Sequence, residues 1–142
     1  MREYLFRGKS INNGEWVSGF YWSLTRDDIA AVHVIRTNRL TDTHEIVDPE
    51  TVGQYTGLTD MNGRKIFEGD VVTIPGSKKQ GLPAYVAWSE GNARFEIHRI
   101  GYNPLFFDLL YSADRGWYAS CEVVGNIYDN PEYLFVKEAA AE

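Results

Sequence analysis

The chain has 142 residues, 44% of them hydrophobic and 14% aromatic, so it has the size of one domain and can fill a core. Its net charge of −6 argues against nonspecific wrapping of nucleic acid, which depends on a basic excess. The single cysteine, Cys121, excludes an intramolecular disulfide and a multi-cysteine metal site. No apolar run has the length of a signal peptide or a transmembrane span, so we expect the protein in the cytoplasm.

Short β-prone segments alternate with turn signals in the first third of the chain. In chain order we expect strands over residues 3–8, 15–22 and 27–36, a turn at 12–14, and a polar segment without a clear assignment at 40–47. The alternation of a strand would place Trp16, Ser18, Phe20 and Trp22 on one face. Asp48 is placed to cap a single turn of helix that follows it.

The rest of the chain continues the same pattern of strands and turns. We expect a strand over 70–74, a polar loop at 75–83 and a hairpin from 84–88 and 93–100. Residues 103–111 are expected to contain a short helix or a buried strand. After them we expect a strand over 117–128, a helical turn at 132–135 and a frayed tail at 137–142. Asn62-Gly63 is a tight-turn signal that predicts a positive φ at Gly63. Cys121, Val123 and Ile127 would lie on one side of the last strand.

Two long motifs carry a resemblance to a known family. Residues 52–72, VGQYTGLTDMNGRKIFEGDVV, are similar to the QYTGLKDKNGKEIYEGDIV core of the YopX family of bacteriophage and prophage proteins. Residues 121–134, CEVVGNIYDNPEYL, are similar to the closing EVIGNIYENPEL of that family, and the opening Phe6–Gly8 with Trp16-Val17 also resembles its start. The resemblance implies phage origin and a β-rich fold, and it implies no reaction, cofactor or catalytic residue.

These observations predict a mainly β protein of short antiparallel strands with one or two short helical pieces. We expect a single domain over residues 1–136, in which roughly residues 66–128 form a curled sheet or SH3-like pseudo-barrel with the N-terminal strands packed on it. A Gly-Asp step followed by a β-branched strand, as at Gly69-Asp70, is how small SH3-like barrels often begin. This analogy concerns the fold and carries no function.

Candidate catalytic and metal-binding groups are better explained as structure. His33, His44 and His98 are scattered, and the best local metal cluster, His44 with Asp42, Glu45 and Asp48, is typical of a solvated loop. His33 is expected at the edge of the core. Glu96 and His98 share a strand face and could support acid–base chemistry, but we expect a solvent-exposed pair. Cys121 has no base in its own segment and is expected to be buried and inert. We therefore expect no catalytic, metal or cofactor-binding residue.

Binding residues are the remaining class of candidate. The exposed half of the aromatic pairs Tyr21-Trp22 and Trp117-Tyr118 could anchor a partner, and a basic grouping could add to them. The residues we expect at an interaction surface are Trp22, Trp117, Arg64, Lys65, Lys78 and Lys79.

We expect a protein-interaction module that binds a host or phage protein in the cytoplasm of the bacterial host. A nucleic-acid-binding accessory protein is the alternative, and an enzyme is disfavoured. A homo-oligomer is possible because exposed strand edges can pair, and no membrane partner is expected.

Overall fold

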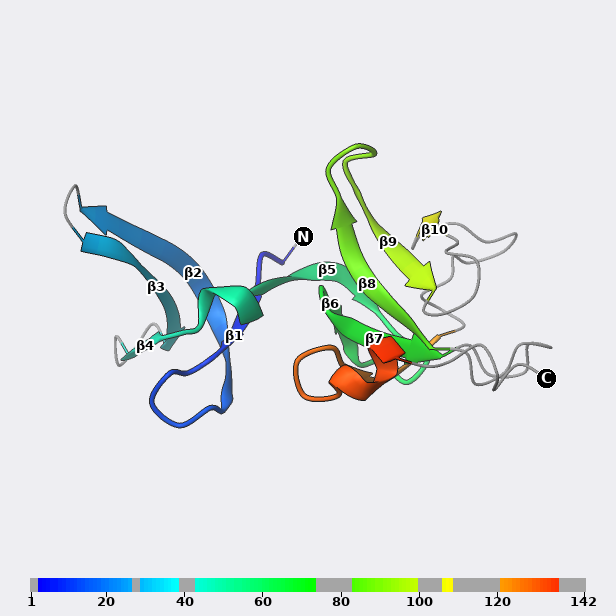
Figure 1. The fold of residues 1–142 in the computed structure, drawn as a ribbon, viewed down its shortest axis with the longest axis horizontal. Helices are drawn as coiled ribbons and strands as arrows, with labels where there is room; N and C mark the ends of the chain where they lie inside the picture. Colours follow the sequence, from blue (N-terminus) through cyan, green and yellow to red (C-terminus); the bar gives the residue numbers. More distant parts are fainter. Residues whose placement is uncertain are drawn as a thin grey trace. The chain divides into compact units, whose positions relative to one another are not determined.

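The structure is a computed structural model that describes residues 3–26, 29–38, 43–73, 83–99, 106–108 and 121–135. Strands dominate these residues, and the helix among them is confined to two short 3₁₀ segments, which confirms the mainly β prediction (Figure 1). The chain forms two compact units, residues 1–55 and 56–142. The expectation of a single domain over 1–136 stays a prediction, and the tail at 137–142 lies outside the described residues.

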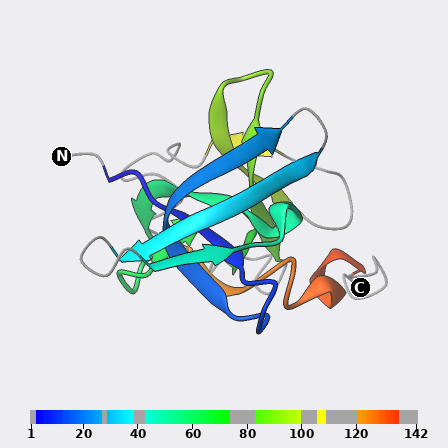
Figure 2. The ribbon, with the colours of Figure 1, turned by 90° about the vertical axis from the view of Figure 1, so that its left-hand side faces the viewer.

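The first unit consists of four strands, a 3₁₀ turn and the beginning of a fifth strand. In chain order these are β1 (Phe6–Lys9), β2 (Trp16–Arg26), β3 (Ile29–Asn38), β4 (Thr43–Ile46), η1 (Pro49–Thr51) and β5 (Gly53–Thr59). The three predicted strands are confirmed, although β2 runs four residues beyond its predicted end, and the unassigned polar segment contains β4. β2 and β3 pair antiparallel and run side by side in Figure 2. Asp48 caps η1 as predicted, because its Oδ1 accepts a hydrogen bond from the Glu50 N–H at 3.0 Å.

The end of β4 is tied back to the end of β1. The Ile11 N–H donates to the Ile46 carbonyl at 3.0 Å, and the Asp48 N–H donates to the Lys9 carbonyl at 2.9 Å. Since β1 also pairs with β2, and β2 with β3, these bonds curl the four strands around a common interior. Ile35 and Val47 fill that interior and are almost fully buried, at 0% and 1% exposed. This small curled sheet fixes which face of β2 points outward.

After the end of β5, the described residues of the second unit form six further strands and a closing helical turn. They are β6 (Lys65–Phe67), β7 (Asp70–Thr73), β8 (Ala84–Ser89), β9 (Arg94–Arg99), β10 (Phe106–Asp108), β11 (Glu122–Asn126) and η3 (Pro131–Phe135). The hairpin of β8 and β9 and the closing helical turn confirm the predictions for these segments. Within 103–111, residues 106–108 form a strand rather than a helix, and the other residues of that segment lie outside the described part.

The strands are hydrogen-bonded in two antiparallel sheets. One has the order β4-β3-β2-β1-β5-β6 and the other has the order β10-β9-β8-β7-β11. Among the described residues neither sheet closes into a barrel, so the open, curled-sheet form of the prediction is confirmed. The likeness to an SH3 barrel stays a prediction.

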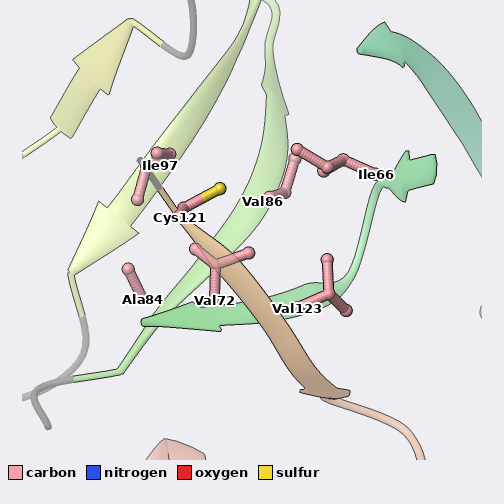
Figure 3. Close-up of a cluster of buried hydrophobic side chains, with 7 residues drawn as sticks. All are labelled: Ile66, Val72, Ala84, Val86, Ile97, Cys121 and Val123. Carbon is pink, nitrogen blue, oxygen red and sulfur yellow. The ribbon is translucent and has the colours of Figure 1, made fainter. Parts of the chain in front are cut away.

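The core of the second unit is a cluster of small aliphatic side chains and one thiol. Figure 3 shows them pointing toward one another from β6, β7, β8, β9, the last strand and Cys121 just before it. The cluster contains Ile66, Val72, Ala84, Val86, Ile97, Cys121 and Val123. Each fully buried Val or Ile contributes roughly 1.5–3 kcal/mol relative to an exposed one, so this cluster is the main apolar stabilisation of the sheet.

A buried carboxylate joins the two motifs that carry the family resemblance. Asp60, in the first motif, is 5% exposed. Its Oδ1 accepts hydrogen bonds from the N–H groups of Asn62 and Arg64, both at 2.9 Å, and its Oδ2 accepts one from Val123 at 2.9 Å. The Met61 N–H also donates to the Cys121 carbonyl at 3.0 Å. The two motifs that resemble the family therefore contain residues that stabilise the fold by hydrogen bonds to each other.

The last strand departs from simple alternation. A β-bulge between Val123 and Gly125 shifts the pairing of β11 with β7. As a result Asn126, which is 8% exposed, takes the next inward position after Val123. The expectation that Cys121, Val123 and Ile127 share one side is correct for Cys121 and Val123. It is wrong for Ile127, because the extra residue of the bulge moves the side chains that follow it to the opposite face.

The turn at Asn62-Gly63 has the predicted left-handed glycine, with φ of +81° at Gly63. The Gly63 N–H donates to the Asp60 carbonyl at 3.0 Å and closes the turn. Replacing Gly63 by Val should lower the free energy of unfolding by about 1–3 kcal/mol, because a β-branched residue is strained at positive φ. Urea denaturation measures this, with Gly91→Val in the other hairpin as the control. Equal stability of the two variants would contradict the strain at Gly63.

Candidate interaction surface

Alternate side chains of β2 form an exposed apolar row. Trp16, Ser18, Phe20 and Trp22 share one face as predicted, and Leu24 continues the row. Phe20 is 45% exposed, Trp22 38% and Leu24 56%. Large apolar side chains with this exposure on consecutive positions of one strand face form a patch rather than isolated surface residues.

The neighbouring strands widen this row into a surface. Trp22 pairs with Val34 on β3, and Val34 pairs with Ile46 on β4, so the three side chains lie across one face. Ile46 is 44% exposed, whereas Val34 between them is buried, at 5%. His44 packs edge-on against Trp22, with ring centroids 6.0 Å apart. We call this surface the outer face and define its apolar members as Trp16, Phe20, Trp22, Leu24, Val34 and Ile46.

Three cations share the outer face. Arg7 pairs with Ser18, Lys9 pairs with Trp16, and Arg36 pairs with Phe20. The guanidinium carbon of Arg7 lies 4.8 Å from the centroid of the Trp16 ring, and the Lys9 Nζ lies 5.5 Å from it. No carboxylate occupies an outward position on the described paired residues of β1, β2, β3 and β4. The outer face therefore carries cationic side chains beside its apolar ones.

The predicted interaction residues belong to different parts of the chain, and their common surface stays a prediction. Trp22 lies on the outer face of the first unit. Arg64 and Lys65 are exposed in the second unit, at the turn before β6. Trp117, Lys78 and Lys79 lie outside the described residues.

The prediction missed several members of the outer face. The alternation of β2 already indicated Phe20. The missed side chains come mostly from other strands, and only strand pairing shows that they meet: Arg7, Lys9, Leu24, Arg36 and Ile46.

The histidines are placed on different parts of the fold. His44 and Glu45 are consecutive in β4 and so point to opposite faces, and Glu45 accepts a hydrogen bond from the Ser10 hydroxyl at 2.9 Å. Asp42, the other expected neighbour, lies outside the described residues. His33 is half-buried, stacked on Tyr21 and hydrogen-bonded to its hydroxyl. The described residues contain no group of three potential ligands close enough for a metal ion.

Glu96 corrects the expectation of a solvent-exposed pair with His98. Glu96 is only 3% exposed. Its Oε1 accepts hydrogen bonds from Asn92 Nδ2 at 2.8 Å and Arg94 Nε at 3.0 Å, and its Oε2 lies 3.1 Å from His98 Nε2. The hydrogen bond from Asn92 is the main cause of the lowered pKa of Glu96; burial opposes it, and Arg94 and His98 support it. The carboxylate thus stays ionised and anchors the hairpin between β8 and β9, where its partners leave little capacity for acid–base work.

Cys121 lies in the core, where it is 0% exposed. Burial, with the nearby carboxylate of Asp60 adding to it, raises the pKa of the thiol to about 12. The thiol therefore stays protonated at physiological pH, as expected for an inert core residue. Among the residues described, no helix is long and apolar enough to cross a membrane.

The class of protein follows from the comparison with known families. The YopX protein family matches residues 5–135, and the chain belongs to this family. A solved structure of similar fold is the crystal structure of protein EF1440 from Enterococcus faecalis, with a TM-score of 0.56 and 26% sequence identity. The similarity covers 94% of this chain and 99% of that one. No curated protein matches the chain.

Proposed function

We propose that this small β protein is encoded by a phage or prophage and binds a protein partner in the cytoplasm of the bacterial host through its outer face. Membership of the YopX family supports the phage origin. The observation that carries the binding role is the exposed row of Phe20, Trp22 and Leu24 on one strand face. When a partner covers such side chains, the binding free energy becomes more favourable by about 25 cal/mol for each Å² of apolar surface removed from water.

The composition of the outer face favours a protein over nucleic acid. Nucleic-acid platforms use open aromatic faces for stacking on bases. Here Arg7 and Lys9 already lie over the Trp16 ring, and His44 packs against Trp22. The aliphatic part of the face, with Leu24 and Ile46, suits the apolar side chains of a protein. Large aromatic anchors surrounded by aliphatic contacts are typical of protein-binding hot spots.

Site-specific crosslinking tests this function. A photoreactive amino acid at Leu24 should crosslink a defined protein in host cells that express the chain, whereas the same group at Met61, which is 51% exposed in the second unit, should not. The crosslinked protein, once purified, should bind the wild-type chain and bind the Leu24→Ser variant about tenfold or more weakly. Met61→Ser is the matched control and should bind as the wild type does. Equal binding by the Leu24 and Met61 variants would contradict a role for the outer face.

A further inference from the structure

We propose that Asn62 is a site of spontaneous deamidation and that the turn to which it belongs controls the reaction. This modification is independent of the function proposed for the outer face. Asn62 and Gly63 are both exposed, so water reaches the side-chain amide. A glycine after an asparagine favours the reaction, because no side chain hinders the approach of the glycine nitrogen to the amide carbon.

The reaction joins the side chain of Asn62 to the main chain. The Gly63 nitrogen attacks Cγ of Asn62, the Cγ–Nδ2 bond breaks, and the proton of the Gly63 nitrogen leaves with the amide nitrogen as ammonia. Water then opens the resulting succinimide ring. Opening at Cγ gives aspartate. Opening at the main-chain carbonyl gives isoaspartate, in which the main chain runs through Cβ and Cγ.

The closed turn slows this reaction because it engages the nitrogen that must attack. The Gly63 N–H donates to the Asp60 carbonyl at 3.0 Å. On either side of it, the N–H groups of Asn62 and Arg64 both donate to Asp60 Oδ1 at 2.9 Å. The main chain at residue 63 is therefore held from both sides. Deamidation proceeds mainly from the opened turn, and such local opening costs less free energy than unfolding of the whole unit.

Both products oppose reclosing of the turn. Asn62 Nδ2 lies 3.4 Å from Glu122 Oε1, so aspartate places a second carboxylate where a hydrogen-bond donor stood. Isoaspartate adds one carbon to the main chain between the N–H groups of residues 62 and 64, which share Asp60 Oδ1. Since Asp60 also accepts the Val123 N–H at 2.9 Å, the modification weakens the connection between the two family motifs.

The experiment ages the full chain at mildly alkaline pH, which promotes loss of the glycine N–H proton, and follows deamidation by peptide mass spectrometry. Asn62 should react about tenfold or more faster in the urea-unfolded chain than in the folded chain. This comparison uses only the wild type, so it does not depend on the folding of a variant. Equal rates in the two states would overturn the control by the turn. No reaction at Asn62 in the unfolded chain would overturn the site itself.

A second Asn-Gly pair, Asn13-Gly14, supplies an internal reference in the first unit, where the Gly14 N–H donates to the Ser10 carbonyl at 2.8 Å. Asp60→Ala removes the carboxylate that holds the turn. It should raise the rate at Asn62 in the folded chain by about fivefold or more and leave the rate at Asn13 within about twofold.

Gly69→Ala separates opening of the turn from unfolding of the unit. It should destabilise the second unit, because a Cβ at this position would lie 2.8 Å from Tyr128, but it keeps the hydrogen bonds to Asp60. At equal unfolded fractions, Asn62 should therefore react more slowly in Gly69→Ala than in Asp60→Ala. Equal rates in the two variants would overturn the role of the turn, because unfolding of the unit would then control the reaction.

The stability of the aged protein tests the consequence of the modification. The isoaspartyl fraction of the wild type should unfold at a lower urea concentration than the unmodified fraction. Asn62→Asp carries the new charge without the longer main chain, so its urea midpoint should fall less. Asn62→Gln, whose longer side chain closes the ring far less readily, should keep its midpoint on ageing. An isoaspartyl fraction as stable as the fresh protein would overturn the weakened connection between the motifs.

Discussion

Replacing Asp60 by Ala is expected to lower the free energy of unfolding by about 2–4 kcal/mol, a large share of the stability of a domain this size. The carboxylate accepts three backbone N–H groups, from Asn62, Arg64 and Val123. Alanine leaves all three donors without this acceptor; the buried Val123 N–H costs about 1–3 kcal/mol, and the N–H groups of Asn62 and Arg64, which are only partly buried, cost less. Urea denaturation followed by tryptophan fluorescence measures the loss. The exposed Glu90→Ala variant is the control and should match the wild type.

The Asp60→Asn variant tests how much of this stability comes from each of the two carboxylate oxygens. The amide keeps one oxygen acceptor, so the variant should lie between Asp60→Ala and the wild type in stability. A loss below about 1 kcal/mol in the alanine variant would show that the three donors find other acceptors.

The same carboxylate makes stability depend on pH. Burial by itself would raise the pKa of Asp60, but the N–H groups of Val123, Arg64 and Asn62 outweigh it and hold the pKa below its ordinary value. A carboxyl whose pKa is lower in the folded state stabilises the fold above its unfolded pKa and loses this contribution as the pH falls through the folded pKa. The wild type should therefore lose more stability than Asp60→Ala between neutral and acidic pH.

Replacing Gly69 by Ala is expected to cost about 3 kcal/mol, from backbone strain and a steric clash together. Gly69 has φ of +86°, and a Cβ on it would lie 2.8 Å from Cε2 of Tyr128. The backbone has little freedom to move away, because the Gly69 N–H donates to Val86 at 2.7 Å and the Gly69 carbonyl accepts from Ile127 at 2.9 Å. Thermal and urea unfolding of the variant measure the combined cost.

A double-mutant cycle assigns the two parts of the Gly69 effect. In a Tyr128→Ala background the ring is gone, so Gly69→Ala should cost only the strain of positive φ, about 1–2 kcal/mol. The difference between the two backgrounds is the clash with the ring. An equal cost in both backgrounds would contradict the contact between the Gly69 position and Tyr128.

Local features of the fold were predictable from the sequence because they depend on adjacent residues. The left-handed Gly63, the Asp48 cap and the hairpin of β8 and β9 each follow from the chemistry of a few neighbouring positions. The bulge in β11 was not predictable, since it depends on how this strand meets β7. The burial of Glu96 was also missed, because it requires Asn92, Arg94 and His98 to converge on one carboxylate.

The candidate surface also has a part that could be predicted from the sequence and a part that could not. Alternation along β2 placed Trp16, Phe20 and Trp22 on one face. The arrival of Arg36 opposite Phe20, and of Lys9 opposite Trp16, depends on the register between separate strands. Register is set by turns and by core packing, so a single strand carries little information about it.

The hydrogen bond between Asp60 and Val123 joins positions 63 residues apart, and this separation bears on the order in which the chain folds during synthesis. In the first unit, β1 through β4 pair within the first 55 residues, so this sheet can form while the ribosome is still making the rest. Asp60 and β7 must wait until β11 emerges. At a synthesis rate of about 5–20 residues per second, that wait lasts several seconds, during which the edge of β7 is open to pairing with other chains. Chaperone demand during translation should therefore fall on the second unit.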